Sequence, residues 1–300
     1  MPDFILKQMQ KKLKVKLSDY GELVKYKLSI AVSVSAGTGY LLYRDASVPG
    51  IIPLLCGVFL LAAGAAALNQ YTERSIDAIM ERTCRRPIPS NRVTLREARY
   101  VFTFLITTGS LILLLNGIIP FFIGLFNVLL YNLIYTSLKK RSALSIIPGA
   151  LVGAIPPLIG FTSAGGTVLN TKILLFASFM FLWQVPHFWL LLIRHGKEYR
   201  KAGFVTISDY LNDTQIKKIT FFWILLTSFV LLLFSGFSDI FSSYFLYIVI
   251  ILNPFFIFFF YRLLFSPKTY NNLKGAFILL NVFSVLIMLL LAADSVFQGL

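Results

Sequence analysis

The fold is decided by residues 49–77, which read PGIIPLLCGVFLLAAGAAALNQYTERSID. The first part, residues 49–68, holds no charged side chain. It is long enough to cross a bilayer, because a membrane-spanning helix needs about 20 mostly apolar residues. Polar and charged residues begin at Asn69 and continue to Asp77. The stretch therefore predicts a transmembrane helix whose end carries hydrophilic side chains to a membrane surface.

Composition extends this interpretation to the rest of the chain. Of the 300 residues, 57% are hydrophobic and 14% are charged, whereas ordinary globular domains are about 45–50% apolar and about 25% charged. These proportions exclude a soluble globular enzyme, a disordered chain and a collagen-like repeat. The two cysteines, Cys56 and Cys84, are too few for a disulfide framework or a cysteine zinc site.

Further apolar runs predict an all-α, polytopic membrane protein with nine transmembrane helices. We expect a basic N-terminal segment, residues 1–27, followed by a single transmembrane domain at residues 28–300. The lysine-rich start lacks the early apolar core of a cleaved signal peptide. The nine predicted crossings are residues 28–43, 49–68, 100–115, 118–138, 143–161, 173–193, 219–234, 240–261 and 276–293.

The distribution of basic residues predicts the orientation in the membrane. With the N-terminus in the cytoplasm, 26 of the 28 lysines and arginines fall in cytoplasmic segments, and only Arg44 and Lys172 fall outside. Cytoplasmic segments of membrane proteins carry such an excess. The net charge of +15 therefore indicates topology and contact with anionic lipid, and no nucleic-acid partner is expected.

Three polar residues with a spacing of four follow the second predicted crossing. Asn69, Glu73 and Asp77 would share one face of a helix, because residues four apart are neighbours on its surface. Mg²⁺ is commonly held by one or two carboxylates together with phosphate oxygens of a substrate, and neighbouring arginines suit a diphosphate. The pattern fits a site for Mg²⁺ and a diphosphate. The alternative is that these residues lie on the solvated end of a helix and bind no ligand. For Glu81 we expect this simpler role, as the partner of Arg85 in an ion pair four residues apart on the helix.

A second group of polar residues lies in and after the sixth predicted crossing. His187 lies inside an apolar run, where ionisable residues are commonly functional. It could be a general base, a metal or haem-iron ligand, or a hydrogen-bonded packing residue. Glu198 could face the first acidic group, or it could pair with Lys201 or Arg194. Lys139 and Lys140 follow directly after the fourth crossing. They could orient this helix in the membrane, as basic residues on the cytoplasmic side do, or they could bind phosphate.

Three blocks of the sequence carry a family resemblance. The first is the acidic motif at residues 69–87, which ends with Met80, Arg82, Thr83, Arg86 and Pro87. The second joins YTSLKK at residues 135–140 to GALVGAIPPLIG at residues 149–160. The third joins WQVPHFW at residues 183–189 to EYRKAG at residues 198–203. In this order the blocks resemble the UbiA-type intramembrane prenyltransferases, and within that family the haem O synthase branch, and three blocks are a far more specific signal than one acidic motif.

The resemblance implies a UbiA-like bundle that transfers the farnesyl group of farnesyl diphosphate to a vinyl group of haem B. The product would be haem O, destined for a downstream haem A synthase or terminal oxidase, and the enzyme would lie in the inner membrane among lipids with its active-site loops in the cytoplasm. It implies Mg²⁺ held by Asn69, Glu73 and Asp77, which act with Lys139 in catalysis. Glu73 and Ser75 stand where the family commonly has aspartates, and Glu73 keeps a carboxylate. The substrate-binding residues that it implies are Arg82, Arg86, Tyr135, Lys140, His187, Glu198, Tyr199 and Lys201.

Two alternatives to this reaction are left open by the residues. Another UbiA-type prenyltransferase, with a quinone-precursor or chlorophyll-like acceptor, would share the acidic motif and differ in the third block. A transporter would place its polar groups near the midplane of the bilayer. In this sequence the polar groups gather at one membrane surface, which disfavours a transporter.

Overall fold

The computed structural model describes residues 16–43, 46, 48–237, 241–266 and 269–299, and within these ranges it is helical, with no β-strand. Eight helical segments are long and apolar enough to cross a membrane, which agrees with eight of the nine predicted crossings. The chain is therefore a multi-pass membrane protein. The segments are Ile51–Asp77, Leu95–Asn116, Ile118–Leu138, Ala143–Ser163, Thr171–Gly196, Asp213–Leu233, Ser243–Phe265 and Asn272–Gln298.

The first predicted crossing, residues 28–43, forms the shorter helix α2 (Tyr26–Leu41) of 16 residues. At about 1.5 Å per residue α2 is about 24 Å long, which is less than the roughly 30 Å of a hydrocarbon core. Another helical stretch, residues 16–23, precedes it. The ninth crossing and the cytoplasmic N-terminus therefore stay predictions.

The fourth predicted crossing is not a uniform α-helix. Its middle, η2 (Leu130–Tyr135), is a π-helical turn between α5 (Ile118–Leu129) and α6 (Thr136–Leu138). Such turns are rare inside helices and are frequent at functional sites. The other helices are α3 (Ile51–Asp77), α4 (Leu95–Asn116), α7 (Ile146–Ser163), α8 (Thr171–Lys201), α9 (Asp213–Leu233), α10 (Ser243–Phe265) and α11 (Thr269–Gly299), with short 3-10 turns η1 (Val48–Gly50), η3 (Ala143–Ser145), η4 (Ile207–Asp209) and η5 (Phe234–Gly236).

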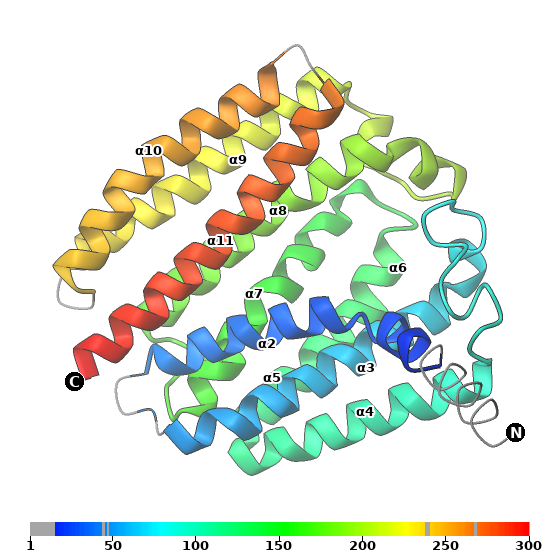
Figure 1. Cartoon of the computed structure of the whole chain (residues 1–300), viewed down its shortest axis with the longest axis horizontal. Helices are drawn as coiled ribbons and strands as arrows, with labels where there is room; N and C mark the ends of the chain where they lie inside the picture. Colours follow the sequence, from blue (N-terminus) through cyan, green and yellow to red (C-terminus); the bar gives the residue numbers. More distant parts are fainter. Residues whose placement is uncertain (1–15, 44–45, 47, 238–240, 267–268, 300) are drawn as a thin grey trace, which may run out of the picture.

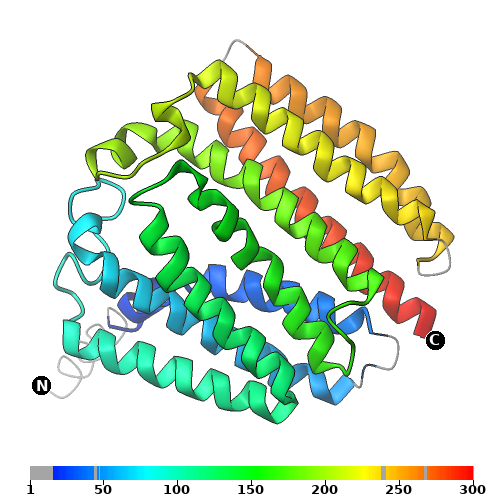
Figure 2. The same ribbon diagram turned by 180° about the vertical axis from the view of Figure 1, so that it is seen from behind.

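Helices that follow one another in the chain pack side by side, and the last helix closes the bundle (Figure 1). α3 packs against α2 and α4, and α9 packs against α8 and α10. α7 contacts α2, α5 and α8, so it joins the two halves of the bundle in the middle (Figure 2). α11 returns to pack against α8, α10 and α2.

Two glycines allow α2 and α7 to approach closely. A Cβ atom on Gly160 would lie 1.8 Å from the carbonyl oxygen of Ala36, and one on Gly39 would lie 2.1 Å from that of Pro157. Membrane helices associate largely through such close packing of small residues. These contacts hold α2 against α7, and both helices form walls of the cavity described below.

Two connections gather at one end of the bundle, which is called the polar end below (Figure 1). They are residues 78–94, between α3 and α4, and residues 202–212, between α8 and α9. The assignment of Glu81 to an ion pair with Arg85 on a helix was wrong. α3 ends at Asp77, so Glu81 lies in the turns that follow, and the described ion pairs do not join it to Arg85.

The helix of the sixth crossing continues beyond its predicted end at residue 193. α8 runs without a break to Lys201 and is 31 residues long. Its last turn carries Arg200 and Lys201, and cations there are stabilised by the partial negative charge of a helix C-terminus. Glu198 and Tyr199 are therefore held by a helix and not by a loop.

Candidate functional site

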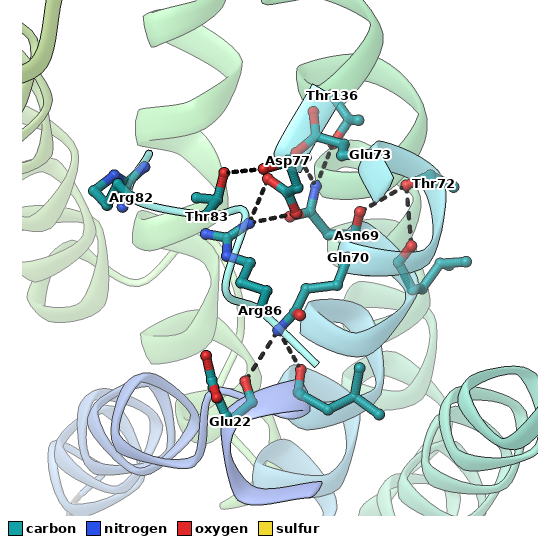
Figure 3. A network of polar contacts seen from close by, with 12 residues as sticks. Glu22, Asn69, Gln70, Thr72, Glu73, Asp77, Arg82, Thr83, Arg86 and Thr136 are labelled. Carbon is teal, nitrogen blue, oxygen red and sulfur yellow. Dashed lines mark hydrogen bonds and ion pairs between the residues drawn. The ribbon is translucent and has the colours of Figure 1, made fainter. Parts of the chain in front are cut away.

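The polar face of α3 is buried. Asn69, Glu73 and Asp77 have relative exposures of only 2–4%, and all three line one cavity. Their common face confirms the prediction from the spacing of four. Figure 3 shows them turned toward Thr136 of α6 and toward Arg86 in the segment that follows α3.

Each carboxylate is paired with a cation from another part of the chain. Lys139 Nζ lies 2.6 Å from Glu73 Oε2, and a terminal nitrogen of Arg86 lies 2.7 Å from both carboxylate oxygens of Asp77. Asn69 donates from Nδ2 to Glu73 Oε2 at 3.0 Å and to Thr136 Oγ1 at 3.2 Å. The network fixes the end of α3 against α6 and against the first turns of the polar end (Figure 3).

The donor set fits a Mg²⁺ ion that is completed by substrate. Glu73 Oε1 is buried and has no hydrogen-bond partner, so one carboxylate oxygen is left for a cation. Across the residues that the structure describes, no cluster brings together three His, Cys, Asp or Glu residues able to hold a metal. Two carboxylates with an amide are nevertheless a normal set for Mg²⁺, which usually takes further oxygens from phosphate and water.

The cavity carries more positive than negative charge. The side chains of Lys25, Arg82, Arg86 and Lys139 line it together with the two acids. Burial lowers the pKa of Lys139, and the Glu73 carboxylate opposes that shift. Burial also lowers the pKa of Lys25 to about 7, and the nearby Arg86 and Lys139 act in the same direction. An anionic ligand would relieve this excess of positive charge.

Aromatic rings form a wall next to the acids. The π-helical turn η2 places Tyr131 and Tyr135 in a stack with ring centroids 5.8 Å apart. Tyr135 also stacks on Phe188 of α8 at 6.1 Å. The Lys139 ammonium lies 5.4 Å from the Tyr135 ring centroid and 5.1 Å from that of Phe204. The negative faces of such rings suit a cation.

The cavity has a volume of about 510 Å³, within the usual range of about 300–1,000 Å³ for ligand sites. Its charged residues lie at the polar end, and its remainder is lined mostly by apolar residues of α2, α3, α5, α7 and α8, with the polar side chains of Asn127, Gln184 and His187 among them. This division fits an amphiphilic ligand with an anionic head and a long apolar tail. The apolar part includes Val32, Val58, Leu61, Ala65, Val128, Val152, Ile159 and Leu191.

The connection between α3 and α4 is joined to the end of α8 across the mouth of the cavity. The backbone N–H of Arg82 donates to Glu198 Oε2 at 3.1 Å, and its guanidinium donates to the Tyr199 hydroxyl at 3.4 Å. The guanidinium carbon also lies 6.0 Å from the Tyr199 ring centroid. The end of α8 therefore closes over the segment that follows α3.

His187 lies inside α8 and lines the cavity. The centroid of its ring lies 4.7 Å from that of Phe277 in α11. Its Nδ1 atom is buried and has no partner. The hydrogen-bonding capacity of this nitrogen is therefore unused, and the contact with Phe277 sets the position of the ring against α11.

The structure brings most of the sequence-predicted residues together. The cavity is lined by Asn69, Glu73, Asp77, Arg82, Arg86, Tyr135, Lys139, His187 and Tyr199, and Glu198 bonds to Arg82 at its mouth. Lys140 and Lys201 are exposed and do not line it. Lys25 and Tyr131 were missed, because Lys25 lies in a basic segment explained by topology and Tyr131 in an apolar run.

Comparisons with known proteins agree with this geometry. The sequence pattern of the UbiA prenyltransferase family matches residues 31–283. A Geobacter sulfurreducens protein named protoheme IX farnesyltransferase is 41% identical over 181 residues, which cover 60% of this chain and 67% of that protein. A Christiangramia forsetii protein of the same name is 34% identical over 218 residues, 71% of this chain and 72% of that protein. Alignments with further relatives of this name span 64–65% of those proteins.

A solved structure shares the fold. The structure of a UbiA homologue from Archaeoglobus fulgidus bound to GPP and Mg²⁺ superimposes with a TM-score of 0.71. The superposition covers 92% of this chain and 99% of that one, at 14% sequence identity. At this identity the likeness establishes the helical architecture alone.

Proposed function

The chain belongs to the UbiA prenyltransferase family, and from this premise we propose that it transfers the farnesyl group of farnesyl diphosphate to a vinyl group of haem B. The products are haem O and diphosphate. The relatives named protoheme IX farnesyltransferase support this donor and this acceptor. The alternative acceptors, quinone precursors and chlorophyll-like rings, have no such support among these relatives.

The observation that carries the proposal is the two-part cavity. Its charged residues gather at the polar end, and its apolar residues continue between the helices. A prenyl diphosphate has this same division, with a diphosphate head on a hydrocarbon chain. A transporter site of the kind considered above would lie near the midplane of the bilayer.

The donor head is held by residues of three segments. Arg86 and Lys139 supply positive charge where the diphosphate leaves, and Arg82 adds a guanidinium at the mouth. Asn69, Glu73 and Asp77 would hold Mg²⁺, which supplies positive charge to the departing diphosphate when it is bound. The apolar walls surround the hydrocarbon chain and exclude bulk water from the allylic carbon.

The transfer makes one carbon–carbon bond and breaks one carbon–oxygen bond. The bond from the first farnesyl carbon to the diphosphate breaks, and that carbon bonds to the terminal vinyl carbon of haem B. Water then adds to the other vinyl carbon and releases a proton, which leaves a hydroxyethylfarnesyl group. Tyr131 and Tyr135 present ring faces that stabilise positive charge on the allylic carbon.

The acceptor side of the cavity is formed by α8. His187 offers the unpartnered Nδ1 to the haem, as an iron ligand or an orienting group. Glu198 and Tyr199 close the mouth through their contacts with Arg82. We place the enzyme in the cell membrane with its polar end in the cytoplasm, because the basic residues gather at that end. A haem A synthase or a terminal oxidase would receive the product.

The test is an assay of the purified full-length chain in liposomes. It contains haem B, farnesyl diphosphate and Mg²⁺, with and without EDTA, and the extracted haem is analysed by mass spectrometry. A haem carrying one hydroxyethylfarnesyl group, absent with EDTA and restored by excess Mg²⁺, is expected. Lys140→Met should match the unaltered chain, since Lys140 is exposed outside the cavity, and Asp77→Asn should be inactive.

Two outcomes would contradict the proposal in different ways. Unmodified haem, with diphosphate released when another aromatic acceptor is offered, would assign the chain to another UbiA-type reaction. No consumption of farnesyl diphosphate with any acceptor would exclude the donor as well.

A further inference from the structure

Lys25 has an unusual backbone conformation at the polar end. It lies between the helical stretch at residues 16–23 and α2, with φ of 47° and ψ of 51°. Among the described non-glycine residues, only Lys25 and Asn91 have a positive φ. Asparagine tolerates this left-handed conformation, but a lysine rarely adopts it. Outliers of this kind persist where the surrounding structure enforces them, commonly at functional sites.

The turn before Lys25 is held by its neighbours and not by the lysine side chain. Gln70 Nε2 donates to the carbonyl oxygens of Glu22 and Leu23, at 3.0 and 2.9 Å (Figure 3). Arg92 pairs with Asp19 and, at 2.7 Å, with Glu22. α3 and the segment after it thus fix the approach of the chain to Lys25, and the lysine ammonium is free for another role.

The Lys25 side chain enters the same cavity as the acidic residues of α3. It lies near Glu73 and Asp77, but these carboxylates are already paired with Lys139 and Arg86. In the part of the chain that the structure describes, no hydrogen bond or ion pair engages the Lys25 ammonium. Lys25 is half-buried beside two further cations of the cavity, Arg86 and Lys139, and a cation placed in this way without a partner is unfavourable until an anion is bound beside it.

We propose that Lys25 is a substrate-binding residue whose ammonium contacts the diphosphate of the prenyl donor, together with Arg86 and Lys139. The inference rests on the proposed function for the identity of the donor. This role adds to the site a residue of the basic N-terminal segment, whose lysines the sequence analysis explained only by the orientation of the protein in the membrane. Residues 16–23 lie against α3, and the left-handed turn at Lys25 then directs the lysine side chain into the cavity.

The test measures binding of inorganic diphosphate with Mg²⁺ to the full-length chain in nanodiscs by calorimetry. Lys25→Gly removes the ammonium and suits the positive φ, so the fold should be kept while the Kd rises about ten- to hundredfold, as expected for one lost charge-assisted contact. Lys25→Arg should stay within a few-fold of the unaltered chain. Lys27→Ala is the matched control, because Lys27 is exposed and lies outside the cavity, and its Kd should not change.

Steady-state kinetics separates the two anionic substrates. In Lys25→Gly the KM for farnesyl diphosphate should rise, and the KM for haem should not. The proposal would be overturned if Lys25→Gly raised the KM for haem alone and if this difference from the unaltered chain disappeared with haem dimethyl ester as the acceptor. Lys25 would then bind a haem carboxylate and not the diphosphate.

Two further results would also overturn the proposal. One is an unchanged diphosphate Kd in a folded Lys25→Gly. The other is loss of folding in Lys25→Gly together with normal affinity in Lys25→Met, which would indicate a purely structural residue. If the unaltered chain binds diphosphate and makes no haem O, the proposed function fails while the binding role of Lys25 stands.

Discussion

The pair of Glu73 and Lys139 provides a quantitative test of how the site is held together. Lys139→Met removes the cation that lies 2.6 Å from Glu73 Oε2. At this distance the Coulomb attraction is roughly 6 kcal/mol for an effective dielectric constant of about 20. The side chains are only 19% and 4% exposed, so the lost attraction is not replaced by water. Breaking a buried pair from one side typically costs about 3–5 kcal/mol, and we expect about 3 kcal/mol because Arg86 and Lys25 lie nearby.

The double variant Lys139→Met, Glu73→Gln tests why Lys139→Met loses stability. The cause is either the unpaired buried charge on Glu73 or the loss of the contacts of the lysine side chain. Without the carboxylate no charge is left unpaired, so the double variant should regain most of the stability and show a coupling energy of about 2 kcal/mol. It should remain inactive, because both groups belong to the proposed site. The assay is equilibrium unfolding in mixed micelles with increasing SDS, followed by circular dichroism.

Lys140→Met is the control, since Lys140 is exposed, and its change should stay within about 0.5 kcal/mol. Two results would refute the reasoning. One is a Lys139→Met variant as stable as the unaltered chain. The other is a double variant whose loss equals the sum of the two single losses.

Three other predictions follow from contacts described above. Gly160→Ala should destabilise the bundle by about 1–3 kcal/mol in the same unfolding assay, because its methyl group would meet the Ala36 carbonyl oxygen; unchanged stability would show that α2 and α7 can separate at no cost. His187→Ala should raise the KM for haem and leave the Kd for diphosphate unchanged, and normal haem kinetics would remove His187 from the acceptor site. Glu198→Ala removes the acceptor for the Arg82 backbone N–H and should raise both KM values up to about tenfold, whereas Glu198→Gln, which keeps an acceptor oxygen, should stay near the unaltered values.

Sequence predicts much of this site because its main parts are local. The spacing of Asn69, Glu73 and Asp77 is a property of one helix, and their common face was predicted correctly, whereas its burial was not predicted. Eight crossings were also predicted, because each is a continuous apolar run. The ends of α3 and α8 were predicted less accurately, because helix ends depend on capping and on contacts with other segments. One such contact is the hydrogen bond that Thr83 Oγ1 donates to the Asp77 carbonyl oxygen at 2.8 Å.

The residues that sequence missed depend on long-range contacts. Nothing local distinguishes Lys25 from its exposed neighbour Lys27; the difference is the turn that Gln70 holds. Likewise, the π-helical turn that stacks Tyr131 on Tyr135 leaves no periodic signal in an apolar run. Lys140 shows the opposite case, because a basic residue beside Lys139 resembles a ligand in the sequence, whereas the structure places it in the turn after α6, exposed and outside the cavity.

The unbroken course of α8 also constrains how this protein can evolve. His187 in the cavity and Glu198 at its mouth belong to one helix, so insertion or deletion of a single residue between them would rotate Glu198 by about 100° and move it about 1.5 Å along the axis. Either change would carry the carboxylate away from Arg82. The connection at residues 164–170 has no such helical register to preserve. Among descendants of this chain, length variation should therefore accumulate in that connection and be absent from residues 188–197.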